Sequence, residues 1–289
     1  MERDARFLVD LLRDRHPVVH ELGQHYLVDT SVLNAAIELA GDITNQHILE
    51  IGCGPGSLTH HLLHAGARVS AIEIDEGSLE HMQRHFKEEI ESEKLTIFAG
   101  DALTVKWPEN IDAIVANIPY QISSPLLERM QREVRACPAV LLVQDEFAER
   151  MAMSIPPLDR GPLGLSLWLD YDIEMGRRVP PSCFSPQPRV TSRLIRLEPI
   201  NRLVSLDSDI DRRMFRQVTS QCFGDRRRKL RNLLKRAPRR LSRIPGWHRE
   251  RWQGAINSLQ PHPLMDERPD MLEPEDWLAL CAQISSFEE

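Results

Sequence analysis

The stretch Glu50-Ile51-Gly52-Cys53-Gly54-Pro55-Gly56 decides the fold of this chain. It includes the end of the apolar run His47 to Ile51 and precedes the helix-like segment Ser57 to His64. Its glycines therefore stand where a buried strand must turn sharply into a helix, and a residue without a Cβ lets the backbone approach a ligand closely. A strand, a glycine-rich turn and a helix in this order predict a βα unit with a nucleoside-type ligand at its edge.

Short apolar runs alternate with helix-like segments on both sides of this turn, from about Ile43 to Leu197. Such alternation is typical of βα units on a parallel sheet. Helices are predicted at Ser57 to His64 and at Ser78 to Ile90, with Ser57 and Ser78 as N-caps. The predicted strands are His47 to Ile51, Arg68 to Ile74, Leu95 to Ala99, Ala113 to Ala116, Val140 to Val143, Leu165 to Tyr171 and Thr191 to Leu197. The pattern predicts an α/β, Rossmann-like domain with a mostly parallel seven-stranded sheet.

The strand pattern stops after Pro199, where helical segments separated by proline-bearing turns begin. The helices predicted there are Arg212 to Cys222, Arg227 to Arg236 and Glu275 to Ser285. This change predicts two domains, an α/β domain over residues 1–200 and a small all-helical C-terminal domain over residues 201–289. The boundary is expected between Glu198 and Ser205.

The composition places the chain among folded globular proteins. Of its 289 residues, 42% are hydrophobic and 27% are charged. No run reaches the roughly 20 apolar residues of a membrane span, and Met1 to His20 mixes charges where a signal peptide needs an apolar run. The five cysteines are scattered, so reduced thiols are expected rather than disulfides or a zinc site. We therefore expect a cytoplasmic protein without a membrane segment or a metal.

The distribution of charge matters more than its sum. A net charge of −7 argues against indiscriminate nucleic-acid binding, because contact with phosphates needs a local excess of Lys and Arg. The segment Arg226 to Arg243 supplies that excess, with Asp225 as the acid beside it. A solvated helix face is the alternative explanation. The one-sided charge favours RNA contact, and the candidate contact residues are Arg226, Arg227, Arg228, Lys229 and Arg231.

The glycine spacing and two downstream acids indicate which ligand the first turn binds. Dinucleotide enzymes use G-x-G-x-x-G, but here Gly56 comes one residue early and Ser57 follows it, which favours S-adenosylmethionine over NAD. Glu73 ends the second predicted strand, where a carboxylate can accept hydrogen bonds from both ribose hydroxyls. Asp101 follows the third strand and can accept a bond from the adenine amine of the cofactor. The alternatives are a turn without a ligand and exposed loop carboxylates, and Asp75 is a less favoured acid because it lies beyond the strand.

The turn Asn117-Ile118-Pro119-Tyr120 ends the fourth predicted strand, beside the same cleft. The lone pair of an adenine amine is delocalised into the ring, so its methylation needs two acceptors that draw the nitrogen toward tetrahedral geometry. The candidate acceptors are the Asn117 side-chain oxygen and the Ile118 backbone carbonyl, which Pro119 restrains. Tyr120 can stack on an unpaired adenine, although a position in the core is the alternative. The turn predicts methylation of adenine in RNA by in-line displacement.

These segments resemble the KsgA-type ribosomal RNA adenine dimethyltransferases, from Leu22 onward over most of the chain. The matching segments are residues 23–27, 50–56, 117–120, 144–150, 179–184, 188–192 and 226–232. The resemblance implies an S-adenosylmethionine-dependent methyltransferase domain that dimethylates two adjacent adenosines near the 3′ end of small-subunit ribosomal RNA. The partner it implies is this RNA within a pre-ribosomal particle, with no oligomer required.

The resemblance also implies individual contacts. The implied cofactor contacts are His25, Leu27, Gly52, Gly54, Glu73, Asp101 and Asn117. Phe184 would be a second aromatic wall for the target base, with a core position as the alternative. Bacterial members usually have Asn where this chain has His25, so the chain is more similar to archaeal and eukaryotic members. The family's basic N-terminal tail is not matched by Met1 to Glu21, which mixes charges.

Three other functions are weighed against this one. A large-subunit adenine methyltransferase of the resistance type shares the cofactor loop and the Asn117 turn, but Val179 to Phe184 and Pro188 to Ser192 match the small-subunit branch better. A DNA adenine methyltransferase would need an additional recognition region. An assembly or transcription factor with little catalysis is disfavoured by the intact Asn117 and Tyr120.

Overall fold

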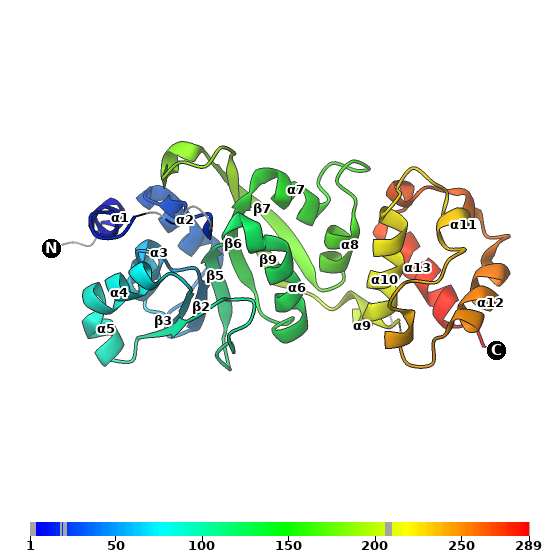
Figure 1. The fold of residues 1–289 in the computed structure, drawn as a ribbon, viewed down its shortest axis with the longest axis horizontal. Coiled ribbons are helices and arrows are strands. Elements are labelled where there is room, and N and C mark those ends of the chain that lie inside the picture. Colours follow the sequence, from blue (N-terminus) through cyan, green and yellow to red (C-terminus); the bar gives the residue numbers. More distant parts are fainter. Residues whose placement is uncertain (1–3, 18, 20–21, 206–209, 289) are drawn as a thin grey trace. The chain divides into compact units, whose positions relative to one another are not determined.

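The computed structural model describes residues 4–17, 19, 22–205 and 210–288. The chain forms two compact units, drawn with their elements in Figure 1. The first unit comprises Met1–Ala148 and Asp172–Pro199, and the second comprises Glu149–Tyr171 and Ile200–Glu289.

The first unit is built on a seven-stranded sheet with the order β4-β3-β2-β5-β6-β9-β7. Its strands are β2 (His47–Ile51), β3 (Arg68–Glu73), β4 (Leu95–Ala99), β5 (Ala113–Asn117), β6 (Ala139–Gln144), β7 (Tyr171–Val179) and β9 (Ser192–Pro199). The pairs β4–β3, β3–β2, β2–β5 and β5–β6 are parallel, while β9 runs antiparallel to β6. The predicted Rossmann-like, mostly parallel seven-stranded sheet is confirmed.

The strand order places a ligand crevice between β2 and β5. From β2 the chain moves outward through β3 to β4 and then returns to β5 on the other side of β2. Ligands of open α/β sheets bind at such a reversal, outside the carboxyl ends of the strands. The glycine-rich loop follows β2, and Asn117 is the last residue of β5. The topology therefore brings the two predicted motifs to one edge of the sheet.

The helices of the first unit follow the βα pattern. A short ladder forms a separate two-stranded sheet in the same unit. The helices are α1 (Ala5–Arg13), α2 (Thr30–Ala40), α3 (Ser57–His64), α4 (Glu76–His85), α5 (Lys87–Glu91), α6 (Ser123–Glu133) and the start of α7 (Asp145–Ala152). The ladder pairs β1 (Tyr26–Leu27) with β8 (Phe184–Ser185). The side chains of Leu8, Val32 and Leu33 are among those fully buried in the core of this unit.

The predicted N-caps are wrong by one and three positions. Gly56, with φ of 83°, precedes α3, so Ser57 is the first helical residue and caps nothing. Asp75 caps α4, because its carboxylate accepts a hydrogen bond of 2.8 Å from the Ser78 N–H. The acid that the sequence disfavours as a ligand thus starts a helix, as Asp commonly does at this position.

The predicted strand from Leu165 to Tyr171 is wrong for most of its length. This segment forms α8 (Pro162–Trp168), and β7 begins only at Tyr171. The alternation of apolar and small residues suggests a strand, but Pro162 at the first helical turn starts a helix. Leu165 and Leu169 are buried in the core of the second unit. The predicted domain boundary at residue 200 therefore misses an excursion of the chain, Glu149–Tyr171, which belongs to the second unit.

The second unit is helical, as predicted. Besides α8 it contains α9 (Arg202–Ser205), α10 (Arg212–Phe223), α11 (Leu230–Leu233), α12 (Arg249–Leu259) and α13 (Pro274–Ser285). Trp252 and Trp277 are among its fully buried side chains. The helix predicted over Arg227 to Arg236 shrinks to α11, because the preceding arginines offer no apolar face to the core. Among the described residues, no helix is long and apolar enough to cross a membrane.

Candidate active site

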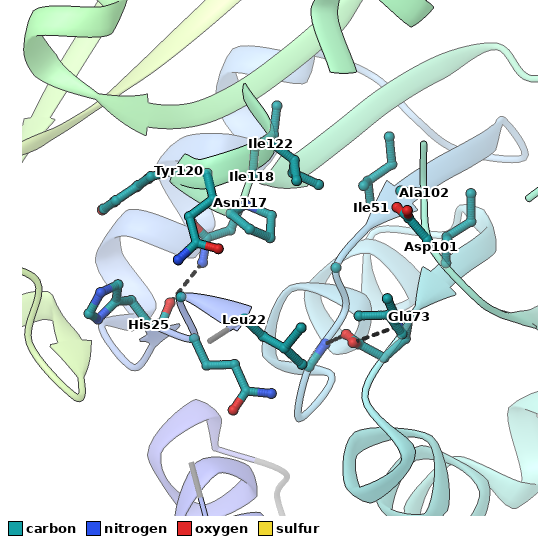
Figure 2. Close-up of a pocket in the computed structure, with 18 of the residues that line it drawn as sticks. Leu22, His25, Ile51, Glu73, Asp101, Ala102, Asn117, Ile118, Tyr120 and Ile122 are labelled. Atoms are coloured by element: carbon teal, nitrogen blue, oxygen red, sulfur yellow. Dashed lines mark hydrogen bonds between the residues drawn. The ribbon is translucent and has the colours of Figure 1, made fainter. Parts of the chain in front are cut away.

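A pocket lies at the carboxyl ends of β2 and β5 in the first unit, and Figure 2 shows the side chains that line it. The N-terminal segment, the glycine-rich loop, the end of β3, the loop after β4 and the turn after β5 all contribute to its wall. The lining residues are 22–26, 51, 52, 54, 72–74, 100–102 and 117–122. The structure thus brings together Gly52, Gly54, Glu73, Asp101 and Asn117, which the sequence predicted as one site.

Two of the three glycines of the loop line the pocket, and their backbone conformation favours glycine. Gly52 and Gly54 have φ of 75° and 51°, in the left-handed region that favours glycine. A Cβ on Gly54 would lie 2.8 Å from the Tyr26 ring, closer than real contacts allow. A Cβ on Gly52 would lie 3.5 Å from Cδ of Pro119. The glycine-rich loop and the turn after β5 are therefore direct neighbours.

Glu73 fastens the glycine-rich loop to the end of β3. Its carboxylate accepts hydrogen bonds from the Gly54 N–H at 2.8 Å, the Ile74 N–H at 2.8 Å and the Asp75 N–H at 2.9 Å. Burial raises the pKa of Glu73, and these three bonds oppose the shift. A carboxylate has about four acceptor positions, so capacity remains for a ligand hydroxyl. Glu73 has a second role that the sequence did not predict, which is to shape the loop beside it.

Asp101 belongs to a loop that is held from behind by a buried arginine. The Asp101 carboxylate accepts from the Leu103 N–H at 2.8 Å. Arg129 of α6, only 6% exposed, donates to the carbonyls of Ala102 and Val105 at 2.7 Å each. Its guanidinium lies 4.6 Å from the centre of the Trp107 ring. Sequence reasoning missed Arg129, because a charge inside a helix gives no sign that it points inward.

Asn117 is oriented by a residue far away in the chain. Its Nδ2 donates to the His25 carbonyl at 3.1 Å, as the dashed line in Figure 2 shows. Since the amide nitrogen is engaged there, Oδ1 of Asn117 points away from the His25 carbonyl and can accept a bond from a ligand. The N–H of Ile118 donates to the Leu142 carbonyl at 3.2 Å, which ties the turn to β6.

Tyr120 is fixed through both its hydroxyl and its ring. The hydroxyl lies 2.6 Å from Oγ of Ser192, which is completely buried at the start of β9. The ring stacks on His25, with centroids 5.8 Å apart and planes inclined by 29°. Nδ1 of His25 donates to the Pro186 carbonyl at 2.9 Å. Burial raises the pKa of the Tyr120 hydroxyl, so it stays neutral.

Two predicted site residues do not line the pocket. Leu27 and Phe184 are partners in the β1–β8 ladder and are 6% and 2% exposed. Both side chains belong to the hydrophobic core of the first unit. The role of Phe184 as a second wall for a base is not supported by this geometry, because the ladder turns its ring inward.

The predicted RNA-binding residues lie in the second unit. Arg226, Arg227, Arg228 and Lys229 are exposed, whereas Arg231 is half-buried. Asp266 pairs with Lys229 at 2.9 Å and with Arg231 at 2.5 Å. The positive charge of this run is therefore concentrated on its three leading arginines.

The described cysteines and histidines form neither a disulfide nor a metal site. All five cysteines are buried and unpaired, and burial raises the pKa of Cys53 in the glycine-rich loop far above its ordinary value. Its thiol is not a nucleophile at neutral pH. The rings of His81 and His85 lie 4.4 Å apart. Within the part of the chain that the structure describes, no three potential ligands gather as a metal site would need.

Known proteins share the sequence and fold of this chain. A family model described as ribosomal RNA adenine dimethylase matches residues 16–243. A protein of Haloarcula marismortui named "Probable ribosomal RNA small subunit methyltransferase A" is 38% identical over 260 residues, which cover 89% of this chain and 87% of that protein. A solved dimethyladenosine transferase from Plasmodium falciparum is 26% identical with a TM-score of 0.72, covering 88% of this chain and 95% of that chain.

A second solved structure shares the fold alone. The 23S rRNA methyltransferase ErmE has a TM-score of 0.62 and 22% identity, and the match covers 90% of this chain and 99% of that chain. The fold is thus common to proteins named for either ribosomal subunit, whereas the relative from Haloarcula marismortui is named for the small subunit.

Proposed function

The chain belongs to the ribosomal RNA adenine dimethylase family, and on this premise we propose that it dimethylates two adjacent adenosines near the 3′ end of small-subunit ribosomal RNA. By family and fold it is an S-adenosylmethionine-dependent rRNA adenine dimethyltransferase. The observation that carries the proposed site is the contact between its two halves. The glycine-rich loop and the Asn117 turn line one pocket, with Gly52 against Pro119.

The residues of the loop fit S-adenosylmethionine, whose sulfonium supplies an electrophilic methyl group when it is bound. Gly52 and Gly54 line the pocket, and their left-handed backbone, which favours glycine, turns the loop there. Glu73 keeps capacity to accept from one more donor, such as a ribose hydroxyl, and Asp101 lies on a loop held by Arg129. Ile51, Ile72 and Ile74 also line this part of the pocket and provide apolar walls for an adenine ring.

The turn after β5 receives the target adenine. Oδ1 of Asn117 and the backbone carbonyl of Ile118 accept hydrogen bonds from the amine, which localises the lone pair on the nitrogen. Tyr120 stacks on the base, and this contact contributes about 1 to 3 kcal/mol for an unpaired nucleotide. The fixed positions of these groups lower the barrier by proximity and by preorganised dipoles.

The two units have separate roles in this proposal. Catalysis belongs to the first unit, predicted as residues 1–200 but without its excursion at 149–171. The second unit, predicted as residues 201–289, contacts the ribosomal particle. Arg226, Arg227 and Arg228 supply exposed charge for RNA phosphates. We propose an immature small subunit in the cytoplasm as the partner, with neither a metal nor an oligomer required.

A methylation assay on both ribosomal subunits tests the proposal. The protein is incubated with labelled S-adenosylmethionine and with small or large subunits from a methylation-deficient strain, and modified adenosines are mapped by primer extension. Dimethylation of two adjacent adenosines near the 3′ end of the small-subunit RNA is expected. Labelled adenosines in the large subunit alone would contradict this function and support a large-subunit adenine methyltransferase of the resistance type.

A further inference from the structure

The loop between β8 and β9 and the first residue of β9 anchor two aromatic rings at the base side of the pocket. Its residue Pro186 holds the His25 ring through its carbonyl, at 2.9 Å from Nδ1. Ser192, directly after the loop, holds the Tyr120 hydroxyl at 2.6 Å. The two stacked rings are therefore anchored at opposite ends of one short segment, Ser185 to Ser192.

Two exposed arginines lie at this segment, one within it and one against its first residue. Arg13 of α1 donates to Oγ of Ser185 at 2.7 Å, and Arg189 lies in the loop itself. Within residues 4–17, 19, 22–205 and 210–288, neither arginine forms an ion pair. Arg193, just beyond the loop, is different, because Asp145 neutralises it at 2.5 Å. Arg13 and Arg189 are thus exposed charges that no carboxylate of the described residues pairs with.

The loop is also restrained before any ligand binds. Pro186 and Pro188 fix two of its φ angles. At one end β8 pairs with β1, and at the other the Thr191 carbonyl accepts from the Asp145 N–H at 3.0 Å. A preorganised loop loses little conformational entropy when a partner binds. Val190 beside Arg189 is 42% exposed and adds an apolar surface.

We propose that Arg13 and Arg189 form a phosphate-binding rim for the single-stranded RNA that carries the adenosine stacked on Tyr120. The guanidinium group matches a phosphate in charge and geometry, and unstacked RNA exposes its phosphates to such a rim. The rim rests on the proposed function, because it is useful only if the adjacent pocket receives an RNA base. It lies in the first unit, apart in sequence from the basic run at 226–231.

Charge-removing variants test the rim in two assays. The first measures KM for immature small subunits, and the second measures binding of a fluorescent single-stranded RNA that contains two adjacent adenosines. For Arg189→Gln we expect KM to rise about three- to tenfold, and the slope of log affinity against log salt to fall by about 0.7. Arg13→Gln should act similarly, while kcat and affinity for S-adenosylhomocysteine stay unchanged.

Arg68→Gln is the matched control, because Arg68 is exposed at the start of β3, the end of the sheet opposite the pocket. It should leave the salt slope unchanged. A wild-type salt slope in both rim variants, or an equal loss of S-adenosylhomocysteine affinity, would overturn the rim. A photo-crosslinking residue in place of Val190 should reach nucleotides that flank the methylated pair, and crosslinks only to distant RNA would also overturn it.

The oligonucleotide assay separates the rim from the proposed function. If the wild-type protein binds the RNA with the expected salt dependence but methylates no small-subunit adenosine, the function fails and the rim stands. If it methylates the small subunit while the variants bind RNA like the wild type, the rim fails and the function stands.

Discussion

The cofactor side and the base side of the pocket are held by contacts of different range. On the cofactor side, Glu73 bonds to Gly54, which is 19 residues away. On the base side, Asn117 bonds to His25 across 92 residues, and Tyr120 bonds to Ser192 across 72. The contact between Glu73 and the glycine-rich loop is thus made within one βαβ unit, whereas the contacts on the base side join segments that are far apart in the chain. Changes on the two sides should therefore affect different steps.

The largest effect is expected for Asn117→Ala on the base side. Loss of one preorganised polar group in an active site lowers kcat about a hundred- to thousandfold. Single-turnover methyl transfer measures this, while affinity for RNA and S-adenosylhomocysteine should stay close to that of the wild type. Asn117→Asp keeps an acceptor oxygen but loses the donor to His25, so an intermediate rate is expected. A wild-type rate in Asn117→Ala would contradict the role of this side chain.

Glu73→Gln should act on the other side of the pocket, with a smaller effect. In the wild type, both carboxylate oxygens accept from backbone N–H groups. In the variant, the amide NH2 faces one of these N–H groups and leaves it without an acceptor, which costs about 1 to 3 kcal/mol. We expect cofactor affinity, measured by calorimetry with S-adenosylhomocysteine, to fall about ten- to a hundredfold. RNA affinity should not change. An equal loss of RNA affinity would show that the two sides are not separable.

Ser192→Ala should have a milder effect on the base side, because it removes only the anchor of Tyr120. A neutral hydrogen bond contributes about 1 kcal/mol, so KM for the RNA substrate should rise about fivefold. Tyr120→Phe removes the same bond from its other end and keeps the ring. The two variants should match, and the double variant should be no worse than either. Additive losses would mean that Ser192 does not act through Tyr120.

The proximity of Glu73 to the glycine-rich loop was predictable because the two lie close together in the chain. The spacing from the glycine-rich loop to Glu73 and the strand order behind it are visible as a pattern along the chain. The positions of Arg129 and Ser192 were not predictable, because their partners lie in distant loops. Phe184 illustrates the same limit, since the register of a two-residue ladder decides that its ring is buried.

Errors outside the pocket have local causes. The segment from Leu165 to Leu169 alternates apolar and other residues like a strand. It nevertheless forms a helix, because Pro162 starts α8 and the consecutive residues Gly164 to Leu167 are all buried. The run Arg226 to Lys229 has helix-forming residues but no apolar stripe, so it remains in turns. Pattern alone does not resolve either case.

The last prediction concerns stability instead of activity, and it is a pH dependence that originates at Glu50 in β2, next to the glycine-rich loop. Burial raises the pKa of Glu50 from an ordinary value of 4.5 to about 8. A group whose pKa is raised by folding holds its proton more tightly in the folded state, so the free energy of unfolding falls as pH rises between these two values. The slope is at most about 1.4 kcal/mol per pH unit.

Denaturant unfolding at several pH values measures this slope. Glu50→Gln is the matched variant, because the amide oxygen can still accept the bond that Thr59 donates to the carboxylate at 2.5 Å. The variant should lose most of the decline in stability between pH 5 and 8, the window set by the shifted pKa. If the free energy of unfolding of Glu50→Gln falls with pH as steeply as that of the wild type, the decline comes from another titratable group.

The distances around a bound adenine test the central claim most directly. A structure with S-adenosylhomocysteine and adenosine should place the adenine amine within about 3.2 Å of both Oδ1 of Asn117 and the Ile118 carbonyl oxygen, with the base against Tyr120. An adenine seated elsewhere in the pocket, or an amine that contacts neither oxygen, would contradict the account.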